Sequence, residues 1–220
     1  MKRVCFIGAS TVEGMGDETG LGWPGRLAAL EREAGNNLVA YNLGVRGQTL
    51  REIGVRAVAE CSARIQDRKT DLIVLGTGMN DLARIGTGAF RTPQRRTLED
   101  FTSLVEGLAD LAPLLVVGPF PVCEAKMPFL STVSGMKFDF RNSDIDEATW
   151  SYTKICSERG VPYLDLFRTL VNEPDYMDGL EANDGLHSNG EGYQVIAKGI
   201  SKWEAWQWER HPSRSSQSAY

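Results

Sequence analysis

Three residues of the chain, Ser10, Asp184 and His187, have the types and the spacing that nucleophilic catalysis needs. A serine hydroxyl is a poor nucleophile near neutral pH and requires a base that is itself oriented by a third group. The chain has two histidines, and His211 lies in a polar, serine-rich end, so His187 is the candidate base. Asp184 precedes it by three positions. A carboxylate about one turn away can accept a hydrogen bond from Nδ1 and leave Nε2 for the serine proton.

Acyl transfer also needs hydrogen-bond donors for the oxyanion that forms on the attacked carbonyl group. The candidate donors are the backbone amides of Ser10 and Gly44 and the side-chain amide of Asn80. Glycine permits close backbone approach, and asparagine donates without burying a charge. Each residue alone also fits a structural role: Ser10 at a helix N-terminus, Gly44 at a strand end and Asn80 in a turn.

These residues follow short apolar runs that have the character of buried strands. Continuous apolar runs bounded by turn residues are typical of strands that are covered on both faces. The predicted strands are 4–8, 38–44, 71–78, 114–120 and 161–167. Because open parallel sheets place ligands beyond the carboxyl ends of their strands, the polar residues after these runs are expected to converge at one edge.

Helix-length segments with helical spacing alternate with the strands. The predicted helices are 22–35, 49–65, 96–112, about 143–159 and 189–208. Thr97 to Asp100 is compatible with a capping box, and Ser143 or Asp144 is a candidate cap for the fourth helix. The alternation predicts a mainly parallel, five-stranded sheet between helices. The last helix would use its tryptophans, Trp203 and Trp206, as core anchors.

The bulk properties favour a folded α/β protein. The chain has 220 residues, 42% of them hydrophobic and 24% charged, and a net charge of −5. We expect one domain over residues 1–210 and a disordered tail over 211–220. The acidic balance provides no overall field that would attract nucleic acid or an anionic membrane. No apolar run reaches the roughly 20 residues of a spanning helix, and the start resembles no complete signal peptide, which predicts a cytoplasmic protein.

The cysteines are expected to be reduced and mostly buried thiols. The four residues, Cys5, Cys61, Cys123 and Cys156, are widely spaced and form no CxxC pair. Too few histidines accompany them for a zinc cluster, so no metal or organic cofactor is predicted.

Four short blocks resemble those of a known enzyme family. "GAST" (8–11), "NLGVRGQT" (42–49), "GMND" (78–81) and "DGLH" (184–187) are similar, in order and spacing, to the blocks of SGNH hydrolases, also called GDSL-like lipases or acylhydrolases. The resemblance covers about residues 4–199. It implies a three-layer α/β/α, flavodoxin-like fold and a serine esterase that cleaves a carboxylic ester through an acyl-enzyme. The natural substrate would be a small molecule, either a lipid, an acetylated sugar, a thioester or a simple ester.

The resemblance also implies roles for individual residues. Ser10 would be the nucleophile, Asp184 and His187 would complete the triad, and Gly44 and Asn80 would join the Ser10 amide as oxyanion donors. The first block departs from the family pattern, because Ala9 stands where an aspartate is usual. The carboxylates that could substitute for it are Glu13, Asp17 and Asp81.

Other residues are candidates for substrate contact. Arg46 lies two positions past Gly44 and is interpreted either as a pocket residue or as a solvated surface arginine. The irregular segment 119–143 carries Phe129 and Phe138, which would line an acyl or alcohol pocket beneath a lid. Alternatively, the segment packs against the body of the protein or against a second subunit. The arginines of the other irregular segment, 83–96, are expected to form a solvated face.

Two further functions are kept as alternatives. One is an SGNH-like domain that binds acylated sugars or lipids without turnover, motivated by Ala9. The other is an α/β protein that binds phosphate or a nucleotide at the loop 8–14. The second alternative lacks the P-loop lysine and a full GxGxxG block, and it leaves Asp184 and His187 without a purpose.

Overall fold

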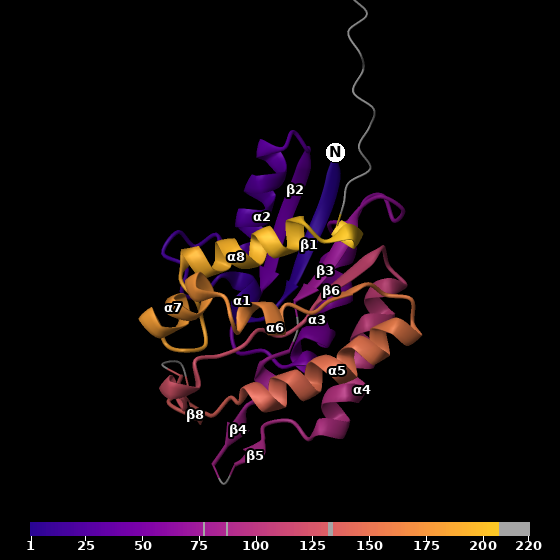
Figure 1. Cartoon of the computed structure of the whole chain (residues 1–220). Helices are drawn as coiled ribbons and strands as arrows, with labels where there is room; N and C mark the ends of the chain where they lie inside the picture. The colour runs from indigo at the N-terminus through magenta and orange to yellow at the C-terminus, as the bar shows by residue number, and fades with distance from the viewer. Residues whose placement is uncertain (77, 87, 132–133, 207–220) are drawn as a thin grey trace, which may run out of the picture.

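A single parallel sheet forms the centre of the molecule. The computed structural model describes residues 1–206 except 77, 87 and 132–133. The central sheet has the strand order β2-β1-β3-β6-β9, and every pair is parallel (Figure 1). The strands are β1 Lys2–Gly8, β2 Leu38–Gly44, β3 Leu72–Gly76, β6 Leu114–Val117 and β9 Tyr163–Leu164. The five predicted strands are thus confirmed, with β3, β6 and β9 shorter than expected.

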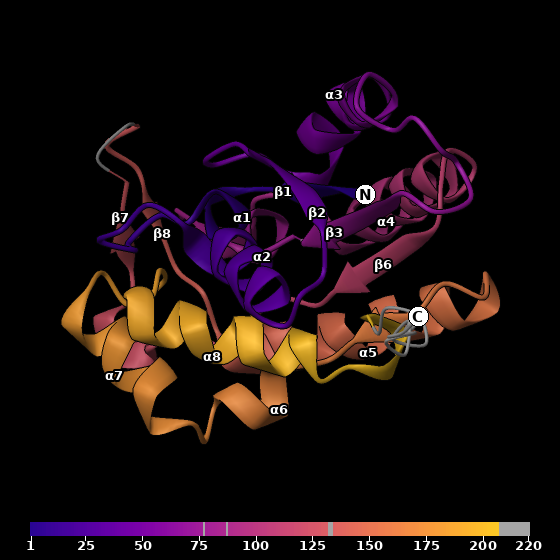
Figure 2. The ribbon, with the colours of Figure 1, turned by 90° about the horizontal axis from the view of Figure 1, so that it is seen from above.

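Helices cover both faces of the sheet and give it three layers (Figures 1 and 2). One face packs against α2, Gly22–Glu33, and α8, Gly190–Ser201. The other face packs against α3, Leu50–Ser62, α4, Gln94–Ala109, and α5, Asn142–Glu158. The predicted α/β/α sandwich is confirmed, because each face of the sheet contributes to its own cluster of buried apolar side chains.

Several short elements were not predicted. They connect the large ones near the carboxyl ends of the strands or follow β9. The helical ones are α1 Ser10–Glu13, α6 Phe167–Leu170, α7 Pro174–Ala182 and the single 3₁₀ turns η1 Asn80–Leu82, η2 Glu124–Lys126 and η3 Glu204–Trp206. The short strands are β4 Arg84–Ile85, β5 Ala89–Phe90, β7 Phe129–Leu130 and β8 Lys137–Phe138.

Glycines at the strand ends allow α1 to approach the sheet closely. Gly8 of β1 pairs with Gly44 of β2 and with Gly76 of β3. A Cβ at Gly8 would overlap the Gly76 carbonyl and Val12, and a Cβ at Gly44 would overlap the backbone of Glu13. These three glycines therefore let the chain turn into α1 directly above the sheet edge.

The starts of two helices differ from the prediction. Helix α4 begins at Gln94 after Pro93, three residues before the expected cap, and the Thr97 hydroxyl donates to backbone carbonyls instead of capping. The capping box predicted at Thr97 is therefore wrong, because proline pre-sets the backbone for an earlier helix start. Helix α5 follows Arg141 without a side-chain cap. The cap predicted at Ser143 or Asp144 is also wrong, since Asp144 instead binds Arg84.

The end of the last helix also differs from the prediction. Helix α8 ends at Ser201, and a 3₁₀ turn over Glu204–Trp206 follows it. Trp206 is buried and Trp203 packs against the same apolar cluster, which confirms both as core anchors. The expected helical residues 207 and 208 and the predicted tail 211–220 lie outside the described residues. The single domain over 1–210 stays a prediction.

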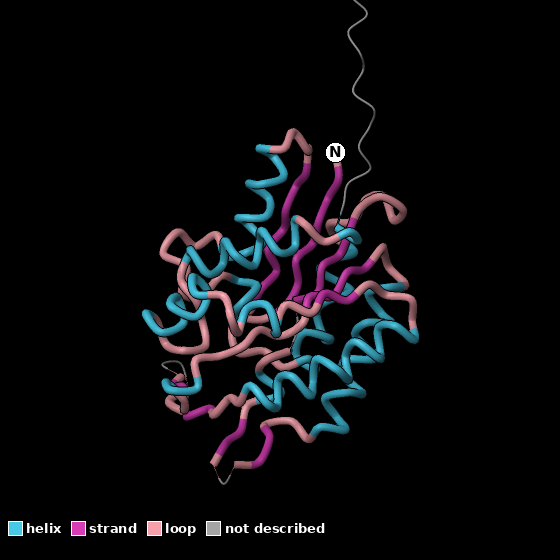
Figure 3. The backbone as a smooth tube through the Cα atoms, in the orientation of Figure 1, coloured by secondary structure: helices cyan, strands magenta, loops and turns pink. Residues whose placement is uncertain are grey.

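The two irregular segments of the sequence meet in space. Each contributes a short hairpin, β4–β5 and β7–β8, at the end toward which the central strands run (Figure 3). Arg84 and Asp139 join the hairpins through two backbone hydrogen bonds of 2.8 and 2.9 Å. The segments 83–96 and 119–143 therefore form one accessory structure.

All four cysteines are free thiols, and three of them are buried: Cys5, Cys61 and Cys156. Among the described helices, none combines the length and the apolar character needed to cross a membrane. The cytoplasmic location and the lack of a nucleic-acid partner stay predictions.

Candidate active site

The side chains of Ser10 and His187 meet at the carboxyl edge of the sheet, although 177 positions separate them in sequence. Ser10 is the first residue of α1, which follows β1 after one residue, Ala9. His187 lies between α7 and α8. The distance between its Nε2 and Ser10 Oγ is 2.8 Å, and both residues are buried. A hydrogen bond of this length allows the imidazole to accept the serine proton.

Asp184 completes a chain of three polar groups. The distance between its Oδ2 and His187 Nδ1 is 2.8 Å. Its Oδ1 accepts hydrogen bonds from the backbone amides of Leu186 and His187, at 2.9 and 2.8 Å. Burial acts to raise the pKa of Asp184, but the hydrogen bond and charge of His187 and the two amides outweigh it and lower the pKa below its ordinary value. The carboxylate is therefore ionised at neutral pH and fixes the ring orientation.

The residues that flank the triad explain how the DxxH block holds its shape. Gly185 has a φ of 83°, a left-handed conformation that suits glycine. After Ser188, the side chain of Asn189 caps α8 by accepting a hydrogen bond from the Gly192 amide. A left-handed turn and a helix cap thus hold both ends of the segment that carries His187.

The loop after α1 packs directly against this segment. The Tyr193 hydroxyl donates to the Met15 carbonyl at 2.7 Å, and Asn183 Nδ2 donates to the Gly16 carbonyl at 3.1 Å. Gly16 has a φ of 92°, and a Cβ there would lie 3.1 Å from the Cβ of His187. The loop that follows Ser10 and the segment that carries His187 are therefore hydrogen-bonded to each other next to the site.

A buried ion pair holds the same loop in place. Arg26 binds Asp17 through two hydrogen bonds of 2.9 Å, and the Gly22 amide donates to the same carboxylate at 2.9 Å. Burial acts to raise the pKa of Asp17, but the bonds from Arg26 and its neighbours lower it to about 2. Glu18 accepts from the amide of Gly190, at 2.9 Å, and so ties the loop to α8.

Asn80 lies in η1 after β3 and contacts the loop after β2. Its Nδ2 donates to the Gln48 carbonyl at 2.9 Å. A primary amide carries two hydrogens on nitrogen, so this bond uses one and leaves the other. Among the described residues, no acceptor for the second hydrogen is present. The predicted donor Asn80 thus keeps one N–H available.

Gly44, the second predicted oxyanion donor, has a backbone amide with a partner of its own. Its amide already donates to the side chain of Asn42, at 3.0 Å. Its lack of a side chain instead admits the backbone of Glu13, as described above. Gly44 still belongs to β2 and lies before the turn that approaches Asn80, and its role as an oxyanion donor stays a prediction.

Gly47, three residues later, is a further candidate oxyanion donor that the sequence interpretation did not name. It has a φ of 73°, and its neighbour Gln48 is the residue that accepts from Asn80. Within the described part of the chain, the Gly47 amide and the Ser10 amide donate to no acceptor. The sequence signal was the second glycine of the block "NLGVRGQT", which a turn with a left-handed residue requires.

The predicted substrate residues have different surroundings. Phe129 lies edge-on to the His187 ring, with 5.7 Å between the ring centres. Phe138 pairs with it across the β7–β8 hairpin and lies beneath the Arg91 guanidinium. Arg46 is half exposed at the rim and binds Glu13 with a separation of 2.8 Å. Phe129 thus lies beside His187 and Phe138 beside Phe129, whereas the arginine charge is balanced by a carboxylate.

The arginines of segment 83–96 are only partly a solvated face. Arg84 binds Asp144 through two hydrogen bonds and stacks on Phe90, and Arg91 donates to the Gly47 carbonyl at 3.0 Å. Both side chains are about three-quarters buried. The others, Arg95 and Arg96, are on the surface and form ion pairs within α4.

None of the carboxylates considered as substitutes at position 9 contacts the serine hydroxyl in the described structure. Ala9 itself is buried within an apolar cluster. Asp17 binds Arg26, Glu13 binds Arg46, and the Asp81 carboxylate accepts from the Leu50 amide at 2.8 Å. The turn at Ser10 is therefore formed without an adjacent carboxylate. Across the described residues, no group of three His, Cys, Asp or Glu side chains could hold a metal ion.

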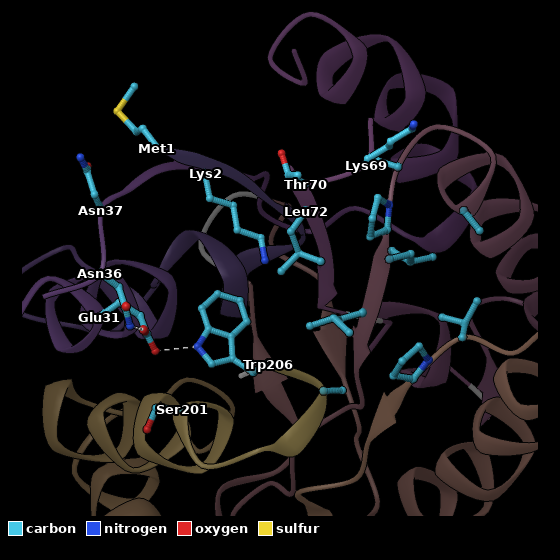
Figure 4. A pocket seen from close by; sticks show the side chains of 18 of the residues that line it. Met1, Lys2, Glu31, Asn36, Asn37, Lys69, Thr70, Leu72, Ser201 and Trp206 are labelled. Carbon is cyan, nitrogen blue, oxygen red and sulfur yellow. Dashed lines mark hydrogen bonds between the residues drawn. The ribbon is translucent and has the colours of Figure 1, made fainter. Parts of the chain in front are cut away.

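A large hollow lies at the opposite edge of the sheet. It has a volume of about 1880 Å³ and opens beside the amino ends of β1, β3 and β6 (Figure 4). Within it, Glu31 accepts hydrogen bonds from Trp206 Nε1 and from Asn36 Nδ2. None of the triad residues lies in this hollow.

Comparisons with known proteins agree with the fold and identify a family. A sequence model described as the GDSL-like Lipase/Acylhydrolase family matches residues 6–195. The solved structure of the lipase/acylhydrolase from Enterococcus faecalis has a TM-score of 0.72 at 17% identity, covering 91% of this chain and 93% of that one. The aryl esterase of M. smegmatis has a TM-score of 0.67 at 18% identity, covering 91% and 99%.

An acetyl xylan esterase from Geobacillus stearothermophilus, solved as a variant with one substituted residue, is also similar. Its TM-score is 0.68 at 17% identity, and the match covers 90% of this chain and 92% of that one. No curated protein sequence matches the chain. At these identities the solved structures establish a shared fold, while the family model spans most of the chain, residues 6–195.

Proposed function

Because the chain belongs to the GDSL-like lipase/acylhydrolase family and is an ester-bond hydrolase, we propose that Ser10, His187 and Asp184 form its catalytic triad. The observation that carries this proposal is the unbroken series of contacts from Ser10 Oγ to His187 Nε2 and from Nδ1 to Asp184, each 2.8 Å long. A nucleophile, a base and an orienting carboxylate in this order are what acyl transfer to serine requires.

In the first half-reaction, Ser10 Oγ attacks the carbonyl carbon of the ester. His187 Nε2 takes the hydroxyl proton, and the ionised Asp184 stabilises the imidazolium that forms. The tetrahedral intermediate then collapses. The C–O bond to the alcohol breaks, and the alcohol leaves with the proton from His187, so that Ser10 carries the acyl group as an ester.

In the second half-reaction, water replaces the alcohol. His187 removes a proton from water, and the hydroxide attacks the acyl-enzyme. The second tetrahedral intermediate collapses to release the carboxylic acid, and the proton on Nε2 returns to Ser10 Oγ. No step requires a cofactor, because a single histidine transfers the proton in both directions.

The oxyanion would be held by three donors. The Ser10 amide and the second N–H of Asn80 retain the roles proposed for them, because neither has an acceptor among the described residues. For the third donor we replace Gly44 by Gly47, whose amide is also without one and whose neighbour Gln48 bonds to Asn80 at 2.9 Å. One donor of this kind contributes roughly 3 to 4 kcal/mol to transition-state stabilisation in comparable sites.

The proposed substrate is an uncharged, small-molecule carboxylic ester. Phe129 and Phe138 offer apolar surface beside the base, and the charge of Arg46 is paired with Glu13. Two of the similar structures are named as an aryl esterase and an acetyl xylan esterase, which favours short acyl groups here. p-Nitrophenyl esters of increasing acyl length would measure this preference, with acetyl expected to give the highest kcat/KM.

An active-site-directed fluorophosphonate probe tests the proposed nucleophile. Wild-type protein should become covalently labelled, and Ser10→Ala should not. Ser103→Ala is the matched control, because Ser103 is exposed on α4 and bonds only within that helix. Folded wild type that takes no label would support a non-catalytic binding domain or a phosphate-binding protein instead. Labelling that persists in Ser10→Ala would move the nucleophile to another residue.

A further inference from the structure

Asn80 and Asp81, two consecutive residues of η1, bind the chain on either side of Thr49. Asn80 Nδ2 donates to the Gln48 carbonyl at 2.9 Å, and Asp81 Oδ2 accepts from the Leu50 amide at 2.8 Å. Thr49 is the N-cap of α3. The two bonds therefore fasten η1 to the start of α3 at two points, one before and one after its capping residue.

The second of these bonds supplies an acceptor that α3 lacks. The first amides of a helix have no partner within it. In α3, the Thr49 hydroxyl accepts from the Glu52 amide, and the Glu52 carboxylate accepts from the Thr49 amide. This capping box leaves the Leu50 amide unpaired. Asp81, from 31 positions away, is its acceptor.

The geometry of a primary amide makes this fastening relevant to catalysis. The two N–H bonds of Asn80 lie in one plane at about 120° to each other, so fixing one fixes the direction of the other. The first points to the Gln48 carbonyl. The position of Gln48 depends on the start of α3, which the Asp81 to Leu50 bond holds against η1.

We propose that Asp81 is a positioning residue that aims the free N–H of Asn80 at the oxyanion by holding the start of α3 against η1. The inference rests on the proposed function, since it assigns Asp81 to the same oxyanion site. Asp81 does not touch the substrate and acts only through Asn80 and Gln48.

The bond between the Leu50 amide and Asp81 requires a carboxylate in a buried position, which is energetically unfavourable. Asp81 is 0% exposed, and its Oδ1 has no hydrogen-bond partner among the described residues. Asp81 and Tyr152, whose hydroxyl is also without a partner among the described residues, both belong to the lining of a cavity of about 80 Å³. A buried carboxylate with one unpaired oxygen is costly, and such costs are found where a precise arrangement is needed.

Charged groups around Asp81 compensate only in part. Burial raises the pKa of Asp81 to about 6, and the charge of Asp100 also acts to raise it. The Leu50 amide, the Thr92 side chain and the Arg91 charge act to lower the pKa and offset only part of this effect. The other carboxylates at the cavity belong to α5: Asp144, which is paired with Arg84, and Glu147, which is exposed.

The test is a double-mutant cycle between Asp81 and Asn80, with kcat and KM measured on p-nitrophenyl acetate. In the wild-type background, Asp81→Ala should lower kcat by roughly 10- to 100-fold with little change in KM, as expected for a small misplacement of a catalytic group. In the Asn80→Ala background, the same substitution should change kcat less than about 2-fold, because a positioning effect disappears with the group it positions. Asp81→Asn keeps an oxygen for the Leu50 amide and should restore most of kcat.

Two controls separate this role from a general loss of structure. Tyr152→Phe removes the other unpartnered polar atom of the same cavity and should leave kcat unchanged. Thermal unfolding must show every variant folded at the assay temperature. An equal loss of kcat from Asp81→Ala in both backgrounds, or no rescue by Asp81→Asn, would overturn the inference. If wild type itself reacts with neither ester nor fluorophosphonate, the proposed function fails before the cycle begins.

Discussion

The starts of α1 and α3 both follow strands of the central sheet at its carboxyl edge, but their backbone amides are bonded differently. Helix α1 begins after Ala9, which has no side chain that could cap it. Helix α3 is capped by Thr49, where a capping box and the Asp81 carboxylate provide acceptors for the amides of Thr49, Leu50 and Glu52. One start leaves the Ser10 amide without an acceptor in the described structure, and the other start has three of its amides bonded to side chains.

This difference indicates separate roles for the two helix starts: one offers an amide to a ligand, and the other holds neighbouring segments in place. An unpaired amide next to a nucleophile is useful only if the group that it should bind arrives with the substrate. Amides that are bonded to side chains cannot bind an oxyanion, but their bonds can hold a neighbouring loop still. Changes around Ser10 should therefore affect catalysis directly, and changes at the start of α3 should affect stability and, through Asn80, kcat.

The largest expected effect comes from disabling the carboxylate behind the base while Ser10 stays in place. Asp184→Asn should lower kcat by about 10⁴-fold, or roughly 5.5 kcal/mol, because the amide favours the wrong histidine tautomer and does not stabilise the imidazolium. Initial rates on p-nitrophenyl acetate would measure it. Asp178→Asn, an exposed change on α7, is the control. More than a tenth of wild-type activity in Asp184→Asn would contradict the triad.

The next effect is a change in the free energy of unfolding with pH, caused by ionisation of Asp81. The pKa of Asp81 is raised from 3.8 to about 6, so between these values the folded state holds a proton that the unfolded chain has released. The free energy of unfolding should therefore fall as pH rises through this window, by roughly 3 kcal/mol for a shift of about 2 units. Urea unfolding of wild type and Asp81→Asn from pH 3.5 to 7.5 would measure the difference. A difference that stays constant with pH would show that Asp81 does not titrate there.

A smaller effect is expected from the cap itself. Thr49→Ala removes the hydroxyl that accepts from the Glu52 amide and should lower the free energy of unfolding by about 1 kcal/mol. Thr49→Ser keeps the hydroxyl and should match wild type. Because the Asp81 bond to Leu50 remains, kcat should fall less than in Asp81→Ala. Denaturant unfolding and measurement of kcat on the same variants would check both statements. A loss of kcat that corresponds to more free energy than the loss of stability would make Thr49 part of the site.

The smallest effect is expected at the rim, on the outer side of α1. Arg46 and Glu13 form a half-exposed ion pair, and such pairs contribute at most about 1 kcal/mol. Arg46→Ala should change the free energy of unfolding by less than about 0.5 kcal/mol and leave KM for a neutral ester within about 2-fold. The same assays at low and at high salt are the control for screening. A large rise in KM would support the alternative that Arg46 binds substrate.

The sheet and the meeting of Ser10 with His187 could be predicted from sequence because both depend on simple physical patterns. Uninterrupted apolar runs require burial on two faces, and parallel strands bring their polar ends to one edge. The accessory hairpins could not be predicted, since they depend on contacts such as the bridge between Arg84 and Asp139, which lie 55 positions apart in sequence and leave no local signal.

The choice between Gly44 and Gly47 as the oxyanion donor shows what the sequence alone could not separate. The sequence shows two glycines in the block 42–49, and either could present an amide to the site. Which one does so depends on where β2 ends, and the pairing with Gly8 extends the strand to Gly44 itself. The first glycine serves close packing and the second, Gly47, forms the turn. Strand ends are set by neighbouring strands, so the residues alone could not separate these two roles.

The bonds between the Ser10 loop and the His187 segment have a consequence for synthesis of the protein. With 177 positions between nucleophile and base, a ribosome working at roughly 5 to 20 residues per second needs about 9 to 35 seconds to pass from one to the other. Throughout that interval the nascent chain carries its serine and then most of its sheet without a base to activate the hydroxyl. If Ser10 and His187 act as proposed, the emerging polypeptide should therefore be inert toward esters until the segment that carries His187 packs against the Ser10 loop.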